Sequence, residues 1–275
     1  MEIPAMKIID AHLHFRTDQP RFIELAKIAG HENTEAHLTK AYGEFNITGG
    51  IVMGGGSLEL SNYQYPAYLK YCAGIQFLDG SPTVTKAMLD DVERHLKQER
   101  CSGIKLYPGY QPTYISDPMY EPLYELAESY DKAVAIHMGL TSRSEVCLKY
   151  SHPLTLDEVA AKHPRVQFVM CHFGNPFLID AAAVMIKNHN VATDLSGLLE
   201  GRVETDGFIR EYRGYVEQLK TWLHFFNRYE DVMFGTDWPL VNLGEYIDFI
   251  ARVIPGKHHE KVFFENANRI YKMGL

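Results

Sequence analysis

Eight short apolar runs, most of them followed by a helix-like segment, constrain the fold of this chain more than any other feature. The runs cover residues 7–15, 48–53, 71–78, 102–107, 133–138, 166–173, 190–195 and 231–236. They are near-continuous rather than alternating, as parallel strands are when both faces of their sheet are covered. Segments such as 84–100 and 121–130 place apolar residues at helical spacing. Strands alternating with helices over eight units predict an α/β protein, a (β/α)8 TIM barrel.

The length of the chain agrees with one domain. Its 275 residues are close to the size of about 250 that is typical of such a barrel. No Pro/Gly/Ser-rich or charge-rich linker divides it, so we expect a single domain over residues 1–275. An open doubly wound sheet is the alternative. It would favour a Gly-rich phosphate turn after the first strand, where His12-Leu13-His14 stands instead.

The composition of the chain favours some classes of binding partner and one cellular location over others. A net charge of −8 argues against nucleic acid, which favours a basic face. No apolar run approaches the ~20 residues that span a bilayer, so we expect no membrane association. The N-terminus lacks a signal-peptide pattern, and the four cysteines form no C-x-x-C pair, which favours the cytoplasm. The expected partner is a small-molecule substrate.

Chemically active side chains gather at the ends of the predicted strands. His12 and His14 stand two apart at the end of the first, so their side chains point the same way. Several later runs also end in polar residues. These are Lys105 and Tyr107, His137, His172, Asp194 and Ser196, and Asp237. In a β/α barrel the active site forms at the C-terminal strand ends, so we expect a metal site there.

A catalytic zinc site needs three or four nitrogen or oxygen ligands and one open position for water. His12, His14, His137 and Asp237 fit that need. Metal-activated water is a nucleophile near neutral pH. Asp237 can bind the metal and also take the proton from that water. His172 is then available to orient the water or to act as an acid toward the substrate.

Seven short motifs are spread over nearly the whole chain. They lie at residues 10–14, 103–108, 135–139, 171–174, 194–197, 234–239 and 264–269. On these motifs the chain resembles the amidohydrolase superfamily, in particular the branch that includes aminocarboxymuconate-semialdehyde decarboxylase. The resemblance implies His12, His14, His137 and Asp237 as ligands of one divalent metal, zinc or manganese, and His172 as a catalytic residue. It also suggests a homodimer.

The resemblance leaves the reaction open. We expect a metal-dependent hydrolase of a small carboxylated or cyclic substrate, which would be a lactone, an ester or an amide. A decarboxylase of an aromatic or unsaturated acid is the alternative, and a non-catalytic metal-binding barrel is the second. Two-metal amidohydrolases carry a carboxylated lysine on the fourth strand. For Lys105 we instead expect a plain amine beside a single metal.

Substrate binding is expected to involve Lys105 and Tyr107 from the fourth strand together with three arginines from loops. These are Arg16, Arg143 and Arg202. An arginine can bind a substrate carboxylate through two parallel hydrogen bonds. The competing interpretation of each arginine is a solvated surface residue.

Overall fold

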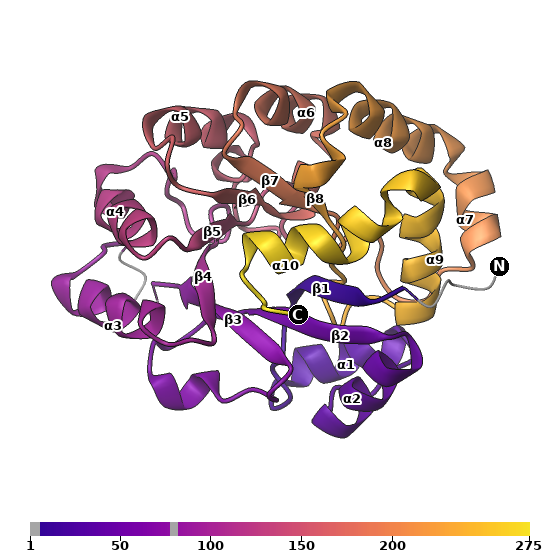
Figure 1. The fold of residues 1–275 in the computed structure, drawn as a ribbon, viewed down its shortest axis with the longest axis horizontal. Coiled ribbons are helices and arrows are strands. Elements are labelled where there is room, and N and C mark those ends of the chain that lie inside the picture. The colour runs from indigo at the N-terminus through magenta and orange to yellow at the C-terminus, as the bar shows by residue number, and fades with distance from the viewer. Residues whose placement is uncertain (1–5, 78–81) are drawn as a thin grey trace. The chain divides into compact units, whose positions relative to one another are not determined.

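Eight parallel strands are hydrogen-bonded in chain order, from β1 to β8, with helices between them (Figure 1). The structure, a computed structural model, describes residues 6–77 and 82–275. The strands are β1 (Ile8–Leu13), β2 (Ile47–Met53), β3 (Leu69–Ile75), β4 (Cys101–Leu106), β5 (Ala133–Ile136), β6 (Phe168–Met170), β7 (Val191–Asp194) and β8 (Val232–Met233). This is the (β/α)8 TIM barrel that the alternating runs predict.

In the part of the chain that the structure describes, ten α-helices follow or cover the strands. They are α1 (Pro20–Ile28), α2 (Glu35–Glu44), α3 (Lys86–Leu96), α4 (Glu121–Ser129), α5 (Leu154–Lys162), α6 (Leu178–Lys187), α7 (Thr205–Glu211), α8 (Arg213–Phe226), α9 (Leu243–Val253) and α10 (Asn266–Ile270). Side chains cap four of them: Thr34 accepts from His37 N, Thr85 from Met88 N, Glu204 from Asp206 N and Gly207 N, and Asn242 from Glu245 N. Each cap satisfies a main-chain N–H that the helix itself leaves unbonded.

The chain divides into two compact units. The first unit comprises the described residues up to Val52, residues 66–69 and residues 194–275. In it the first strand meets the last: Ala11 N donates to Phe234 O at 2.9 Å, and His14 N donates to Trp238 O at 2.8 Å. Helix α10 packs against β1 (Figure 1). These bonds hold the residues after β1 beside those after β8.

The second unit comprises residues 53–65 and 70–193. Strands β4, β5, β6 and β7 pair in parallel register, with Lys105 opposite Ala135 and Ala135 opposite Val169. Helices α3 and α4 pack against each other, and so do α5 and α6 (Figure 1). Strands β4, β5 and β6 are buried along their whole length, which explains their near-continuous apolar sequences.

Strand ends differ from the sequence expectation at several points. Residues 166–173 were expected as one strand, but β6 stops at Met170 and a 3₁₀ turn, Cys171–Gly174, follows it. In that turn His172 has a φ of 63° and Phe173 a φ of 45°, a left-handed conformation that is uncommon outside glycine. Residues 231–236 give only the short β8. The third run gives β3, and its last residue, Leu78, lies outside the described residues.

Within residues 6–77 and 82–275, no helix has both the length and the apolar character needed to cross a lipid bilayer.

Candidate metal centre

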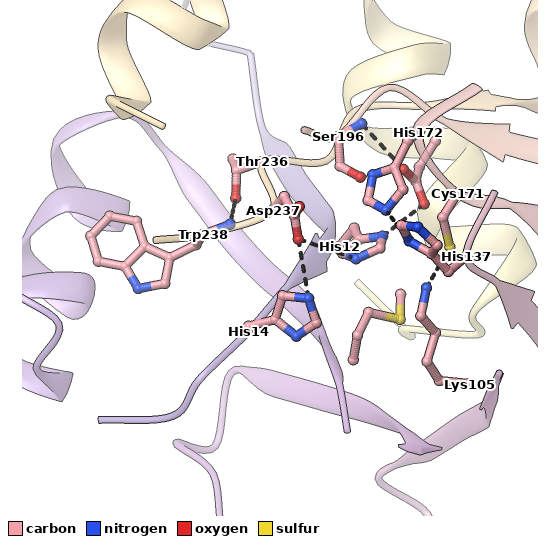
Figure 2. Close-up of polar contacts among 12 residues, drawn as sticks. His12, His14, Lys105, His137, Cys171, His172, Ser196, Thr236, Asp237 and Trp238 are labelled. Carbon is pink, nitrogen blue, oxygen red and sulfur yellow. Dashed lines mark hydrogen bonds and ion pairs between the residues drawn. The ribbon is translucent and has the colours of Figure 1, made fainter. Parts of the chain in front are cut away.

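Two histidines and an aspartate converge in the first unit (Figure 2). His12 is the fifth residue of β1, and His14 follows the end of that strand. The Nε2 atoms of His12 and His14 lie 3.4 and 3.1 Å from the same oxygen, Oδ1 of Asp237. Asp237 comes after β8 with a φ of 59°, a left-handed conformation that aspartate tolerates better than most residues. Its main-chain N–H donates to His12 O at 2.8 Å, which holds the carboxylate beside the imidazoles.

A second carboxylate fixes the His12 ring from behind. His12 Nδ1 lies 3.0 Å from Asp194 Oδ2 at the end of β7, and both side chains are fully buried. Asp194 is itself held by Ser196, whose main-chain N–H and hydroxyl donate to Oδ1 at 3.1 and 2.5 Å. A buried carboxylate accepts a hydrogen bond from an N–H group, so the neutral His12 ring carries its proton on Nδ1. The Nε2 lone pair then faces Asp237.

The residues of this cluster fit a divalent metal. Ligand atoms at ~2.1 Å from a tetrahedral zinc lie roughly 3.4 Å from one another, which agrees with the separations of 3.4 and 3.1 Å to Asp237 Oδ1. The candidate ligand atoms of His12, His14 and Asp237 all lie within 4.8 Å of one another. A lone pair of His12 and a carboxylate oxygen repel unless a cation or a proton stands between them. Two imidazoles and a carboxylate are also ligands that zinc and manganese accept.

A third carboxylate, Asp10, underlies the cluster. It is fully buried and accepts hydrogen bonds from Thr236, Tyr42 and the main chain of His12. Burial raises the pKa of Asp10 to about 6, against the lowering effect of these hydrogen bonds. Asp10 therefore links β1, α2 and the residues after β8.

The second unit contains a separate pair of histidines. His137, one residue past β5, lies with Nδ1 3.1 Å from Nε2 of His172 and with Nε2 3.0 Å from Leu140 O. A carbonyl can only accept, so His137 Nε2 carries a proton and, in the neutral ring, Nδ1 bears the lone pair. A ligand role for His137 thus requires that Nδ1 leave His172 or that the ring turn over. Tyr110 packs on His137 with 4.9 Å between ring centroids.

Lys105 is buried at the fifth position of β4 and does not reach solvent. Its Nζ donates to Cys171 Sγ at 2.9 Å (Figure 2). The same Nζ lies 5.2 Å from the centroid of the Tyr107 ring. Tyr107 in turn donates its hydroxyl to Gly54 O at 2.5 Å. The ammonium is thus held by a thiol and by the face of an aromatic ring, the latter a cation–π contact.

The three predicted arginines lie in different surroundings. Arg143 and Arg202 are largely exposed, and their side chains pair with Glu145 and Glu245. Arg16 is half-buried, and its main-chain carbonyl accepts from Asn33. Their roles in substrate binding stay predictions.

Sequence reasoning overlooked three contributors to these clusters. Asp10, the partnership of Asp194 with His12, and Cys171 all act through contacts between distant strands. Only Asp10 carried a usable signal, because it stands two residues before His12 and so shares its side of β1.

The fold and the cluster in the first unit together define a class of protein. It is a β/α barrel with a candidate metal site formed by a His-x-His pair and an aspartate. The amidohydrolase family model matches residues 9–273, nearly the whole chain, and the protein belongs to that family. The search of curated proteins found no match.

Solved structures similar to this chain share its barrel. A probable 2-pyrone-4,6-dicarboxylic acid hydrolase from Acinetobacter baumannii is 18% identical, with a TM-score of 0.66 over 97% of this chain and 100% of that one. A zinc-bound amidohydrolase from Burkholderia multivorans is 15% identical, with a TM-score of 0.68 over 97% and 99%. The 2,6-dihydroxybenzoate decarboxylase from Rhizobium is 14% identical, with a TM-score of 0.66 over 98% and 100%.

Proposed function

We propose that this protein is a metal-dependent hydrolase of a small carboxylated or cyclic substrate, which would be a lactone, an ester or an amide. The observation that carries the proposal is the convergence of His12 and His14 on one oxygen of Asp237, at separations of 3.4 and 3.1 Å. His12, His14 and Asp237 would hold one divalent metal, zinc in the first instance and manganese as the second choice. A solved structure with the same fold, an amidohydrolase from Burkholderia multivorans, holds bound zinc.

A metal held there would lower the pKa of a bound water and polarise a carbonyl group of the substrate. Asp237 would accept the proton of the attacking water. Asp194 keeps the Nδ1 proton on His12, so that Nε2 remains available as a ligand.

The second unit would supply proton transfer. His172 and His137 share a hydrogen bond of 3.1 Å, and a paired imidazole can pass a proton to a leaving group. We retain His172 as the candidate acid. His137 as the fourth metal ligand, and Lys105 and Tyr107 as substrate-binding residues, stay predictions from the sequence.

Decarboxylation of an aromatic or unsaturated acid is the second candidate. The similar structures include a hydrolase named for a pyrone dicarboxylic acid and a decarboxylase named for a dihydroxybenzoate. Both names denote small carboxylated rings, which favours a substrate of that class for either reaction. A lysine at the end of β4 suits a carboxylate in both cases.

The first experiment is elemental analysis of the full chain purified without added metal or chelator, beside a His12→Ala/His14→Ala variant. We expect one zinc or manganese per chain in the wild type and none in the variant. A matched control is His224→Gln, because His224 lies on the exposed side of α8. A wild type that neither carries nor takes up metal would overturn the proposal.

The metal-loaded protein is then incubated with two panels of compounds. The first contains aryl and alkyl lactones, and the second contains carboxylated aromatic acids. Hydrolysis releases a proton per turnover and opens the ring, whereas decarboxylation releases carbon dioxide. Acid release without carbon dioxide supports the hydrolase, and carbon dioxide release supports the second candidate. Metal binding without turnover of either panel would favour a non-catalytic barrel.

A further inference from the structure

The carboxylate of Asp10 joins the two chain segments that carry the proposed metal ligands. Asp10 Oδ1 accepts from His12 N at 3.2 Å and from Thr236 N at 2.9 Å. His12 belongs to β1 and is one ligand, while Thr236 directly precedes another, Asp237. One oxygen atom therefore ties the main chain at one ligand to the main chain beside the other.

Thr236 extends this connection through its hydroxyl. Thr236 Oγ1 donates to Asp10 Oδ2 at 2.6 Å and accepts from Trp238 N at 2.9 Å. The hydroxyl thus bonds on both sides of Asp237, which stands between Thr236 and Trp238. Because Asp237 has a left-handed φ of 59°, its neighbours must be held for its carboxylate to keep its direction.

We infer that Asp10 and Thr236 are positioning residues that set the separation between His12 and Asp237, and thereby the affinity of the site for its metal. The inference rests on the proposed metal site. Neither residue is a candidate ligand, and both are fully buried. Groups that orient ligands commonly change metal affinity by 10- to 100-fold when they are replaced.

A purely stabilising role is the competing explanation, and the same carboxylate offers a control for it. Tyr42, on α2, donates its hydroxyl to Asp10 Oδ2 at 2.9 Å. That bond reaches Asp10 from a helix that bears none of the proposed ligands. Tyr42→Phe therefore removes one hydrogen bond from Asp10 while it leaves both ligand-bearing segments bonded to it.

The test is the zinc affinity of the metal-stripped full chain, measured by competition with a chromophoric chelator, together with the urea midpoint of each apoprotein. Thr236→Val removes the hydroxyl at nearly constant volume, and Thr236→Ser restores it. We expect zinc to bind 10- to 100-fold more weakly to Thr236→Val, and within about twofold of the wild type to Thr236→Ser. Tyr42→Phe should lower the urea midpoint yet bind zinc within about threefold of the wild type.

Two results would overturn the inference. Wild-type zinc affinity in Thr236→Val would show that the hydroxyl does not position Asp237. Losses of affinity that simply follow the urea midpoint, in Tyr42→Phe as in Thr236→Val, would reduce Asp10 to a stabilising residue. If Thr236→Val does not fold, Asp10→Asn serves instead. The new amide nitrogen faces one of the two groups through which Thr236 donates to Asp10, so that hydrogen bond is lost. We expect the zinc affinity to fall to the same degree.

These outcomes are distinct from failure of the proposed function. If the wild type itself binds no zinc, the metal site falls and this inference falls with it. If the wild type binds one zinc that His12→Ala/His14→Ala loses, but the positioning variants bind equally well, only the inference is overturned.

Discussion

The two units of the chain carry histidine clusters of opposite character. In the first unit the partners of His12 and His14 are carboxylates, Asp194 and Asp237. In the second, His137 and His172 bond to each other and to a carbonyl, and Lys105 bonds to the thiol of Cys171. Carboxylates concentrate negative charge and lone pairs, which a cation relieves, whereas an imidazole pair exchanges a proton. The contrast supports the proposed roles of His12, His14 and Asp237 as metal ligands and of His172 in proton transfer.

Asp237→Asn should give the largest effect, because it removes both a proposed ligand and the proposed base. We expect turnover to fall by at least ~10³-fold while the far-ultraviolet circular dichroism stays that of the wild type. Initial rates on the substrate found in the screen provide the measurement. Asp18→Asn, at an exposed position, is the control. Near-normal turnover in Asp237→Asn would remove this residue from the mechanism.

His172→Gln tests whether the second cluster differs in kind from the first. We expect kcat to fall by ~10²-fold with one metal per chain retained, because proton transfer is lost and the metal ligands are not. His14→Gln should instead lose metal. If elemental analysis shows that both variants lose metal alike, the two clusters do not have separate roles, and His172 is a ligand.

The sequence indicated features that depend on neighbouring residues and did not indicate contacts between residues that are distant in the chain. The order and approximate positions of the strands followed from apolar runs, because a buried parallel strand needs apolar residues at its own positions. His12 and His14 followed from the period of a strand. The bond between His12 and Asp194 joins residues 182 apart in the chain, so neither spacing nor composition could indicate it. The turn that carries His172 was missed because Cys171 and Phe173 extend the apolar run of β6, and Gly174, with a φ of 59°, was the available turn signal.

Lys105→Met examines the second cluster as a substrate site rather than a metal site. Nζ of Lys105 donates to Cys171 Sγ and is not a proposed ligand, so we expect the metal content to stay at one per chain. Loss of an ammonium that binds a substrate carboxylate should raise KM by about tenfold or more with a smaller change in kcat. Lys132→Met is the control, since Lys132 Nζ donates to Cys101 O at the start of β4. A change in metal stoichiometry in Lys105→Met would place Lys105 among the ligands.

A third pair of imidazoles should give the smallest effect, because neither ring is a proposed metal ligand or catalytic residue. His31 Nε2 accepts from Leu243 N at 3.1 Å, and its Nδ1 lies 2.9 Å from His37 Nε2. Burial, followed by His37 and Arg202, lowers the pKa of His31 to about 4 against the raising effect of Glu245. The unfolded chain therefore binds more protons between pH ~6.5 and ~4, so stability is lost as the pH falls through that window.

The size of this loss is modest. A pKa lowered from 6.5 to about 4 corresponds to ~3 kcal/mol for an enclosed group, and solvent around the half-buried ring reduces it to roughly 1 kcal/mol. Urea unfolding at pH 7.5 and pH 4.5 measures the free energy of unfolding of the wild type and of His31→Gln. At pH 7.5 the variant should be the less stable because it loses the Leu243 bond, and the gap should narrow at pH 4.5. Parallel losses in both proteins would mean that His31 does not contribute to the acid sensitivity.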